Sequence, residues 1–211
     1  MSKDFDVILA AFVQSTNDNG YPQSVFSFCS SMELNETEFY KTIGSFKALE
    51  QRFWVMQWEK CMETLETDAT FQGYNANEKV LALFFTWTEQ LTMYKSFIFA
   101  CLQKHKRFIL YKGTLSCLET PFKAFTEKII SQGIEEGSVR NRPFITPYYG
   151  KALWFQFLLI LDFWIHDESQ AHEATDEAIE KAVNLAFQFL AETPIDSLVD
   201  LARFLIKSYN K

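Results

Sequence analysis

The fold of this chain is decided by residues 7–54, VILAAFVQSTNDNGYPQSVFSFCSSMELNETEFYKTIGSFKALEQRFW. Apolar residues first recur at helical spacing and then stop at Gly20, Tyr21 and Pro22, where a helix cannot easily continue. Two short helical patterns follow, separated by a tight connection, and a longer pattern begins after Gly44 and Ser45. This punctuation predicts a helix-turn-helix unit that leads into a long helix.

The rest of the chain continues the helical pattern. Apolar residues recur at intervals of three and four, and the five prolines mark expected joints at positions 22, 121, 143, 147 and 194. The chain is therefore predicted to be all-α. Asn35 with Glu38 three residues on is typical of a capping box, and Ser45 can cap the next helix. Thr193 before Pro194 marks the start of a last helix. We expect about ten helices, at residues 3–18, 24–31, 35–43, 46–67, 77–93, 96–105, 119–136, 146–167, 171–191 and 194–209.

The composition is that of a folded protein with a sizeable core. Of the 211 residues, 48% are hydrophobic and 22% are charged, and the net charge is −7. The apolar run at residues 152–165 is interrupted by Gln156 and Asp162 and is too short to cross a membrane, and the first residues lack the basic start of a signal peptide. We expect a cytoplasmic protein without a membrane span.

The four cysteines do not form a recognisable metal or redox motif. Cys29, Cys61, Cys101 and Cys117 lie far apart, and no C-x-x-C pair occurs. Reduced thiols in the core are the expected state, and no cofactor is expected.

Four short motifs follow one another between residues 20 and 49. They are Gly20-Tyr21 after the first helix, Ser24-Val25 at the start of the second, Phe39-Tyr40 in the third, and GSFKAL at residues 44–49. In this order they resemble the head of tetracycline-repressor (TetR) family regulators, with one residue fewer between Tyr21 and Ser24. The resemblance implies a TetR-like fold: a three-helix helix-turn-helix head at residues 1–50 and a C-terminal bundle for ligand binding and dimerisation at residues 51–211.

The same resemblance implies that the helix at residues 35–43 enters the major groove of operator DNA. Hydroxyl and basic side chains would contact phosphates, and other side chains of this helix would face base edges. The implied phosphate contacts are Ser24, Tyr40, Lys41 and Lys47, and the implied base contacts are Glu36, Thr37 and Glu38.

The predicted head is short of positive charge. Glu33 stands where the family has a turn glycine, and residues 21–50 hold two lysines against four glutamates. Since DNA binding depends on neutralising phosphates, this composition weakens the expected affinity. In an alternative interpretation, Phe39, Tyr40 and Phe46 only pack the helices of the head together.

The C-terminal part is rich in aromatic residues, which could line an apolar pocket or simply form the core. The family keeps its pocket in the fifth to seventh helices, here expected at residues 77–93, 96–105 and 119–136, so the resemblance implies a small apolar or aromatic effector. Its implied contacts are Trp87, Tyr94, Phe97, Phe122 and Phe125. Residues 125–137 end in a Gly133-x-x-x-Gly137 step found in many members, and the two long helices at 146–167 and 171–191 would form a four-helix interface in a homodimer.

No motif points to catalysis, so an enzyme is not expected: glycine-rich phosphate loops, paired carboxylates and a Ser-His-Asp order are all missing from the sequence. One group of carboxylates and imidazoles could offer metal ligands, but solvation and helix capping explain it equally well, and no metal is expected. This group consists of Asp162, His166, Glu168, His172 and Glu173. The basic run at residues 104–107, which contains His105, is expected to be a solvated loop.

Two functions of different class fit these observations. The first is a one-component transcription regulator, most simply a repressor, in which an effector changes the spacing of two DNA-reading heads. The second is a small-molecule or lipid-binding protein that has the TetR-like fold but has lost DNA binding. For the second, residues 149–176 resemble the lipid-binding accessory protein of ubiquinone biosynthesis. An apolar stripe at residues 195–206 would fit membrane contact, although such a stripe more commonly packs against the bundle.

Overall fold

The computed structural model describes residues 3–103 and 111–191. Within these ranges all regular elements are helices, so the predicted all-α fold is confirmed. No helix of the described part is both long enough and apolar enough to cross a membrane. The α-helices are α1 (Lys3–Asn19), α2 (Val25–Ser31), α3 (Glu36–Thr42), α4 (Phe46–Thr67), α5 (Ala76–Leu91), α6 (Lys95–Leu102), α7 (Tyr111–Thr114), α8 (Ser116–Glu135), α9 (Tyr149–His166) and α10 (Glu173–Leu190). Short 3-10 turns are η1 (Phe71–Gly73), η2 (Thr92–Tyr94), η4 (Thr146–Tyr148) and η5 (Gln170–His172).

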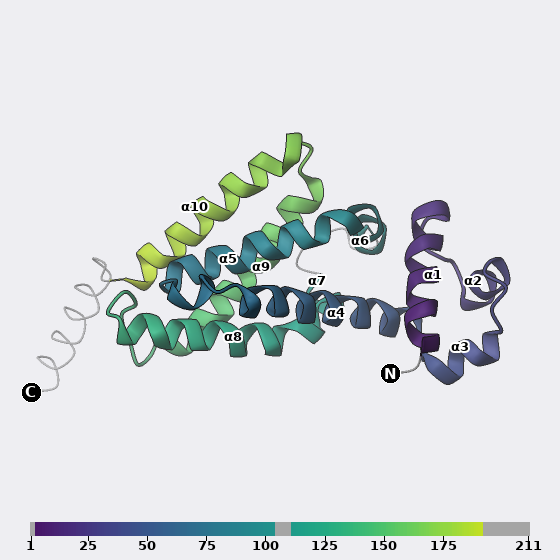
Figure 1. Cartoon of the computed structure of the whole chain (residues 1–211), viewed down its shortest axis with the longest axis horizontal. Coiled ribbons are helices and arrows are strands. Elements are labelled where there is room, and N and C mark those ends of the chain that lie inside the picture. The colour runs from purple at the N-terminus through teal and green to yellow at the C-terminus, as the bar shows by residue number, and fades with distance from the viewer. Residues whose placement is uncertain (1–2, 104–110, 192–211) are drawn as a thin grey trace, which may run out of the picture.

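Figure 1 shows α1, α2 and α3 grouped at one end of the molecule, and α4 running from this group into a bundle of longer helices. We call α1–α3 the head and the helices from α4 onward the body. In the body, α4 packs against α5 and α8, and α10 packs against α5 and α9. The C-terminal end of α10 lies far from the head (Figure 1).

The head is built around Phe12 of α1, which is fully buried. The Phe12 ring stacks on Phe46 at 5.3 Å and meets the edges of Tyr21 and Phe28 at 5.8 and 6.0 Å. Phe39 joins the same cluster through Phe28 and Phe46. Phe39 and Phe46 therefore pack the head, whereas Tyr40 lies on its surface.

The predicted helix caps are partly correct. The Ser45 side chain accepts from the Ala48 N–H, as expected, and Asn35 accepts from the Thr37 N–H. The capping box predicted for Asn35 and Glu38 is wrong, because Glu38 extends along α3 to Lys41, at 3.1 Å. The residues 194–209, where a last helix capped at Thr193 was predicted, lie outside the described part of the chain.

The predicted joint at Pro121 is also wrong. Pro121 lies inside α8, which begins at Ser116 and not near residue 119. A proline inside a helix lacks the N–H for one backbone hydrogen bond. Pro121 lies in the second turn of α8, so the first turn of the helix forms before this missing bond. The helical turn α7, just before α8, was not predicted from the sequence.

The Gly133-x-x-x-Gly137 step has a steric reason. A Cβ on Gly133 would lie 2.6 Å from Val139 Cγ2 and 3.0 Å from the Ala76 Cβ, so the chain after α8 and the start of α5 approach too closely for a side chain. Gly137 has φ +76°, a conformation that glycine adopts without strain. The step therefore ends α8 and folds the chain back across α5.

Besides the ring of Phe46 at the start of α4, a second aromatic residue and a hydrogen bond connect the head to the body. Phe97 of α6 is buried and touches Phe12 of the head at 5.6 Å and Phe53 of α4 at 4.9 Å. The Tyr21 hydroxyl, just after α1, donates to the buried Glu50 of α4. The predicted domain boundary after residue 50 stays a prediction, and α4 runs through it as one helix.

Candidate DNA-binding head and effector site

The turn between α2 and α3 has the geometry that a helix-turn-helix needs. Glu33 adopts φ +54°, in the left-handed region, directly after the last turn of α2. The Leu34 N–H then donates to the Cys29 carbonyl at 2.8 Å, and the Met32 N–H donates to the Phe28 carbonyl at 3.1 Å. This is the pattern of a left-handed C-terminal cap, which redirects the chain into α3 within a few residues.

Glycine at position 33 is expected to stabilise the protein. A non-glycine residue in the left-handed region is strained, so Glu33→Gly should raise the free energy of unfolding by about 0.5–1 kcal/mol. Urea denaturation of the variant and the wild type measures this change. Glu38→Gly is the matched control: it introduces glycine inside α3, where we expect destabilisation by about 1 kcal/mol. A loss of stability in Glu33→Gly would contradict the strain at this turn.

The exposed face of α3 carries most of the predicted DNA contacts. Thr37, Glu38, Tyr40 and Lys41 are exposed and Glu36 is half-buried, while Phe39 faces the core of the head. The other two predicted residues, Ser24 at the N-cap of α2 and Lys47 in the first turn of α4, are also exposed. The structure therefore presents these residues on the surface of the head, and their role in DNA binding stays a prediction.

The positive charge of this surface is low. The Lys41 ammonium lies 3.1 Å from the Glu38 carboxylate, and both side chains are about two-thirds exposed, at 67% and 64%. An exposed pair of this kind contributes little to stability, so it can open without much cost when a phosphate approaches. Without DNA, the Glu38 carboxylate offsets the positive charge of Lys41. Lys47, in the first turn of α4, is a second exposed lysine near α3.

The structure divides the five predicted effector residues into two groups. Trp87 and Phe122 are buried and share Phe157 as a neighbour, at 5.3 and 4.8 Å between ring centroids. Phe125 joins this group through Trp58 at 6.2 Å. We call this contacting group, Trp58, Trp87, Phe122, Phe125 and Phe157, the aromatic cluster.

Tyr94 and Phe97 form the second group, and Phe97 lies at the contact between body and head. They both touch Phe53 of α4, at 5.2 and 4.9 Å. The sequence could not separate the two groups because Phe97 is an aromatic residue in an apolar helix like the others. Its distinguishing neighbour, Phe12, is 85 positions away in the sequence, and only the fold brings them together.

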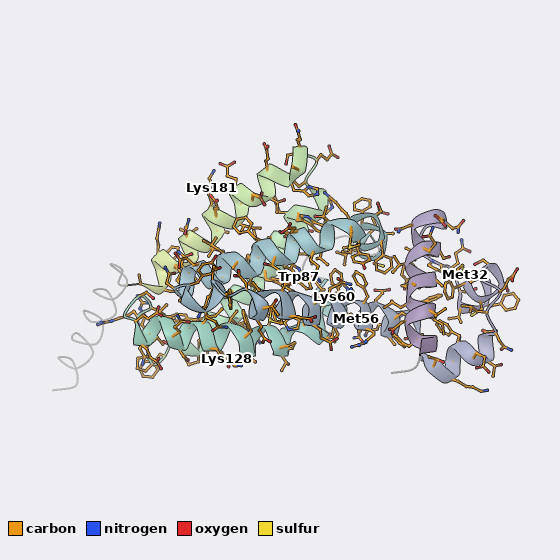
Figure 2. All side chains as sticks on the ribbon, in the orientation of Figure 1. Met32, Met56, Lys60, Trp87, Lys128 and Lys181 are labelled. Carbon is orange, nitrogen blue, oxygen red and sulfur yellow. The ribbon has the colours of Figure 1, made fainter. Side chains whose placement is uncertain are left out.

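The aromatic cluster is closely packed, but one of its residues and an adjacent tryptophan each hold a buried hydrogen-bond donor without a partner among the described residues. Figure 2 shows Trp87 where α5 runs beside α4. The Nε1 atoms of Trp87 and of Trp154, which touches both Phe122 and Phe157, are buried without a hydrogen-bond partner among the described residues. A buried donor without a partner costs about 1–3 kcal/mol. A bound molecule with an oxygen acceptor would remove this cost.

Cavities also open elsewhere in the described part of the body, and three of them have a well-defined lining. One of about 350 Å³ lies between α9, α10 and the chain before α9, and one of about 500 Å³ lies between α5, α9 and the start of α10. A third, of about 400 Å³, lies between α4 and α5 and includes Lys60 and Tyr94. Of the five predicted effector residues, only Tyr94 lines any of these three cavities, so an effector in the aromatic cluster would have to separate packed rings.

Two long helices expose an apolar face. On α9, Phe155, Leu159 and Phe163 follow one another at intervals of four and are all exposed. Leu185 and Phe189 of α10 are also exposed. The cavity of about 350 Å³ lies beside them, between the same two helices. Neighbouring exposed apolar side chains of this kind often mark a surface that a partner covers.

The histidines, carboxylates and cysteines singled out in the sequence have ordinary surroundings where the structure describes them. The His166 Nδ1–H donates to the Asp162 carbonyl at 2.8 Å, and no three His, Cys, Asp or Glu side chains of the described ranges converge on a metal-sized site. The basic run with His105 lies outside these ranges. All four cysteines are free, as expected, and burial raises the pKa of the Cys61 thiol to about 12, which makes it unreactive.

These features define a class of protein: an all-α chain with a helix-turn-helix head joined by one long helix to an aromatic body. A family model described as "Tetracyclin repressor-like, C-terminal domain" matches residues 79–205, well over half of the chain. The chain therefore belongs to the TetR family of transcription regulators.

A solved structure supports the fold. A chain from Shewanella sp. PV-4, assigned to the TetR family of transcription regulators, superimposes with a TM-score of 0.64. The two sequences are 12% identical, and the alignment covers 91% of this chain and 100% of the other. At this identity the likeness concerns the fold alone. No curated protein matches the sequence.

Proposed function

We propose that this TetR-family protein is a one-component regulator that binds operator DNA through its head and responds to a small apolar or aromatic effector in its body. The observation that carries this proposal is the left-handed turn at Glu33, which places α3 on the outside of the head with Phe39 inward. That arrangement leaves one face of α3 free to enter a major groove.

The proposed DNA contacts are side chains on and around α3. Ser24, Tyr40, Lys41 and Lys47 are exposed around α3 and would bind phosphates, while Thr37 and the two glutamates Glu36 and Glu38 would face base edges. A glutamate can accept a hydrogen bond from the cytosine N4 amino group, so an acidic base contact is chemically reasonable. With few cations, affinity should be modest and its salt dependence shallow.

Lysine removal tests the DNA interface. In the proposed complex Lys41→Ala and Lys47→Ala should each weaken binding about equally for all sequences, and each should reduce the slope of log affinity against log salt by about one. Fluorescence anisotropy at several salt concentrations measures both effects. Lys128→Ala is the control, because Lys128 lies on α8 in the body, away from the head (Figure 2), and should leave the slope unchanged.

A selection of random DNA fragments at low salt identifies the operator sequence that the protein prefers. Glu36→Ala should change the preferred sequence, and neutralising Glu36 and Glu38 together should strengthen non-specific binding. If the wild-type protein enriches no sequence, with or without candidate effectors, the regulator proposal fails. The alternative is a TetR-fold binding protein that does not bind DNA. One observation favours it: the Lys41 ammonium already pairs with the Glu38 carboxylate, which reduces the positive charge offered to phosphates.

We further propose that two copies associate through α9 and α10. A twofold axis would place Phe155, Leu159 and Phe163 of one copy against the same residues of the other, because such interfaces are self-complementary. The resulting four-helix interface would hold the two heads at one end. Operator binding requires the heads to fit successive major grooves, about 34–36 Å apart.

The effector would act by separating rings of the aromatic cluster. It would bind the conformation in which the cluster is open, and this shifts the population toward the head spacing that goes with it. Its apolar body would replace ring contacts, and an oxygen atom on it would accept from Trp87 Nε1 or Trp154 Nε1. Phe97 would then transmit the change, since its ring lies between Phe53 of α4 and Phe12 of the head.

A further inference from the structure

The cavity of about 500 Å³ between α5, α9 and the start of α10 is separate from the aromatic cluster. Thr88 lines this cavity, whereas its neighbour Trp87 on α5 turns to the other side and stacks on Trp54 of α4. The walls combine hydroxyl groups, carboxylates and aromatic rings, a mixture that a purely structural contact between three helices does not need.

The hydroxyl groups of this cavity can only accept. Thr88 Oγ1 donates its proton to the Phe84 carbonyl at 3.0 Å, and Thr92 Oγ1 donates to the Thr88 carbonyl at 3.0 Å. Thr175 Oγ1 donates to Asp167 Oδ2 at 2.6 Å. Because each proton is already used, each oxygen has lone pairs left for a donor on a ligand.

The cavity is also negatively charged. Glu89 of α5 and Asp176 of α10 both line it, and neither forms an ion pair with a described residue. The neighbouring cation is Lys95, which donates to the Asp167 carbonyl at 2.7 Å and lies 3.4 Å from His172 Nδ1. With two carboxylates and three acceptor oxygens, the cavity suits a ligand that brings positive charge and N–H donors.

Trp164 supplies the complementary donor. Its side chain is fully buried, it lines the cavity, and its Nε1 has no hydrogen-bond partner among the described residues. The ring of Phe85 lies on the α5 side of the same space. The Lys95 ammonium already lies 5.5 Å from the centroid of the Trp164 ring, so Phe85 is the ring that faces an organic cation in this space. The indole N–H of Trp164 needs an acceptor oxygen, so the lining favours an organic molecule over a bare metal ion.

We propose that this cavity binds a small organic cation, namely an amine with an aromatic or apolar body and a hydroxyl or carbonyl oxygen. The ammonium group pairs with Glu89 and Asp176 and donates to the threonine oxygens. The oxygen of the ligand accepts from Trp164 Nε1.

The position of the cavity gives the ligand a route to the head. His172, in the cavity wall, touches Lys95, which is the first residue of α6. The same helix carries Phe97, whose ring packs against Phe12 of α1. A ligand that displaces His172 therefore acts on the contact between body and head. This coupling rests on the proposed regulatory function, whereas the binding site itself does not.

Calorimetric titration of the full chain with three matched compounds tests the site. Tyramine carries the amine, tyrosol is its neutral analogue and 4-hydroxyphenylacetate its anionic analogue, all on the same phenol ring. We expect tyramine to bind at least tenfold more tightly than either analogue. Glu89→Gln and Asp176→Asn should each weaken tyramine binding about tenfold, since each removes one charge-assisted contact. Glu180→Gln, one turn further along α10, removes the same charge outside the cavity and should leave binding unchanged.

Equal binding of the three compounds, or unchanged tyramine affinity in both Glu89→Gln and Asp176→Asn, overturns the inference. The affinity of the protein for DNA, with and without each compound, is measured separately by fluorescence anisotropy. If tyramine fails to bind while DNA binding responds to apolar compounds, this site is excluded and the proposed function stands. If tyramine binds as expected but the protein selects no DNA sequence, the site is supported and the regulatory function fails.

Discussion

Replacing Phe155 and Phe163 together by aspartate is expected to convert the protein from a dimer into a monomer at micromolar concentration. Both side chains lie on the exposed face of α9 and are about half exposed in the single chain, at 48% and 45%. In a twofold dimer each substitution occurs twice, so four carboxylates would face one another where apolar rings are now available. The dissociation constant should rise by about 1000-fold or more, because apolar burial is lost and like charges are brought together.

Sedimentation velocity of the wild type and the variant measures this change, and circular dichroism shows whether the variant keeps its helices. Phe26→Asp is the matched control. Phe26 is an exposed phenylalanine of the same size, but it lies on α2 in the head, away from α9 and α10. Its replacement should leave the dimer intact. A wild-type monomer, or a variant that still dimerises, would contradict the proposed interface.

The Trp87→Phe variant is expected to lose about tenfold in affinity for an effector that accepts from the indole. Phenylalanine keeps an aromatic ring in the cluster but removes Nε1, a donor that has no partner among the described residues. Alanine would be a poor choice, because Trp87 is only 1% exposed and its truncation would cost about 3–5 kcal/mol of stability. The readout is the rise in melting temperature with planar aromatic ketones or medium-chain fatty acids, which stabilise the native state by preferential binding.

Trp58→Phe provides the control for this experiment. Trp58 belongs to the same aromatic cluster and contacts Trp87 and Phe122. Unlike Trp87 Nε1, its Nε1 is not among the buried donors that lack a partner. It should lower the melting temperature of the free protein without a selective loss of the ligand response. An equal ligand response in wild type and Trp87→Phe would place the effector site elsewhere, and the amine-binding cavity would then be the first place to examine.

The local features of the head were predictable because they depend on residues close in sequence. The break at Gly20, the cap at Ser45 and the short helix at residues 36–42 each follow from neighbours within one or two turns. The αL turn at Glu33 was harder to predict, because glutamate rarely adopts that conformation and the chain carries no glycine there.

A sequence pattern does not determine which partner a side chain chooses, even within one helix. Glu38 could reach back to the start of α3 or forward to Lys41, and both positions are allowed by spacing. The structure has the forward pair. That choice matters for function, because it determines how much free positive charge the head offers to DNA.

The sequence by itself determined that the chain is all-α, where most helices begin and end, and which family its head resembles, because helix periodicity and capping act over a few residues. Only the tertiary structure decided which aromatic rings meet. It assigned Trp87 and Phe122 to one cluster and Phe97 to the contact with Phe12 of the head. It also gathered Glu89, Trp164 and Asp176 from three helices around one cavity. Periodicity identifies the buried face of a helix, but the neighbour that covers this face is set by packing across the whole fold.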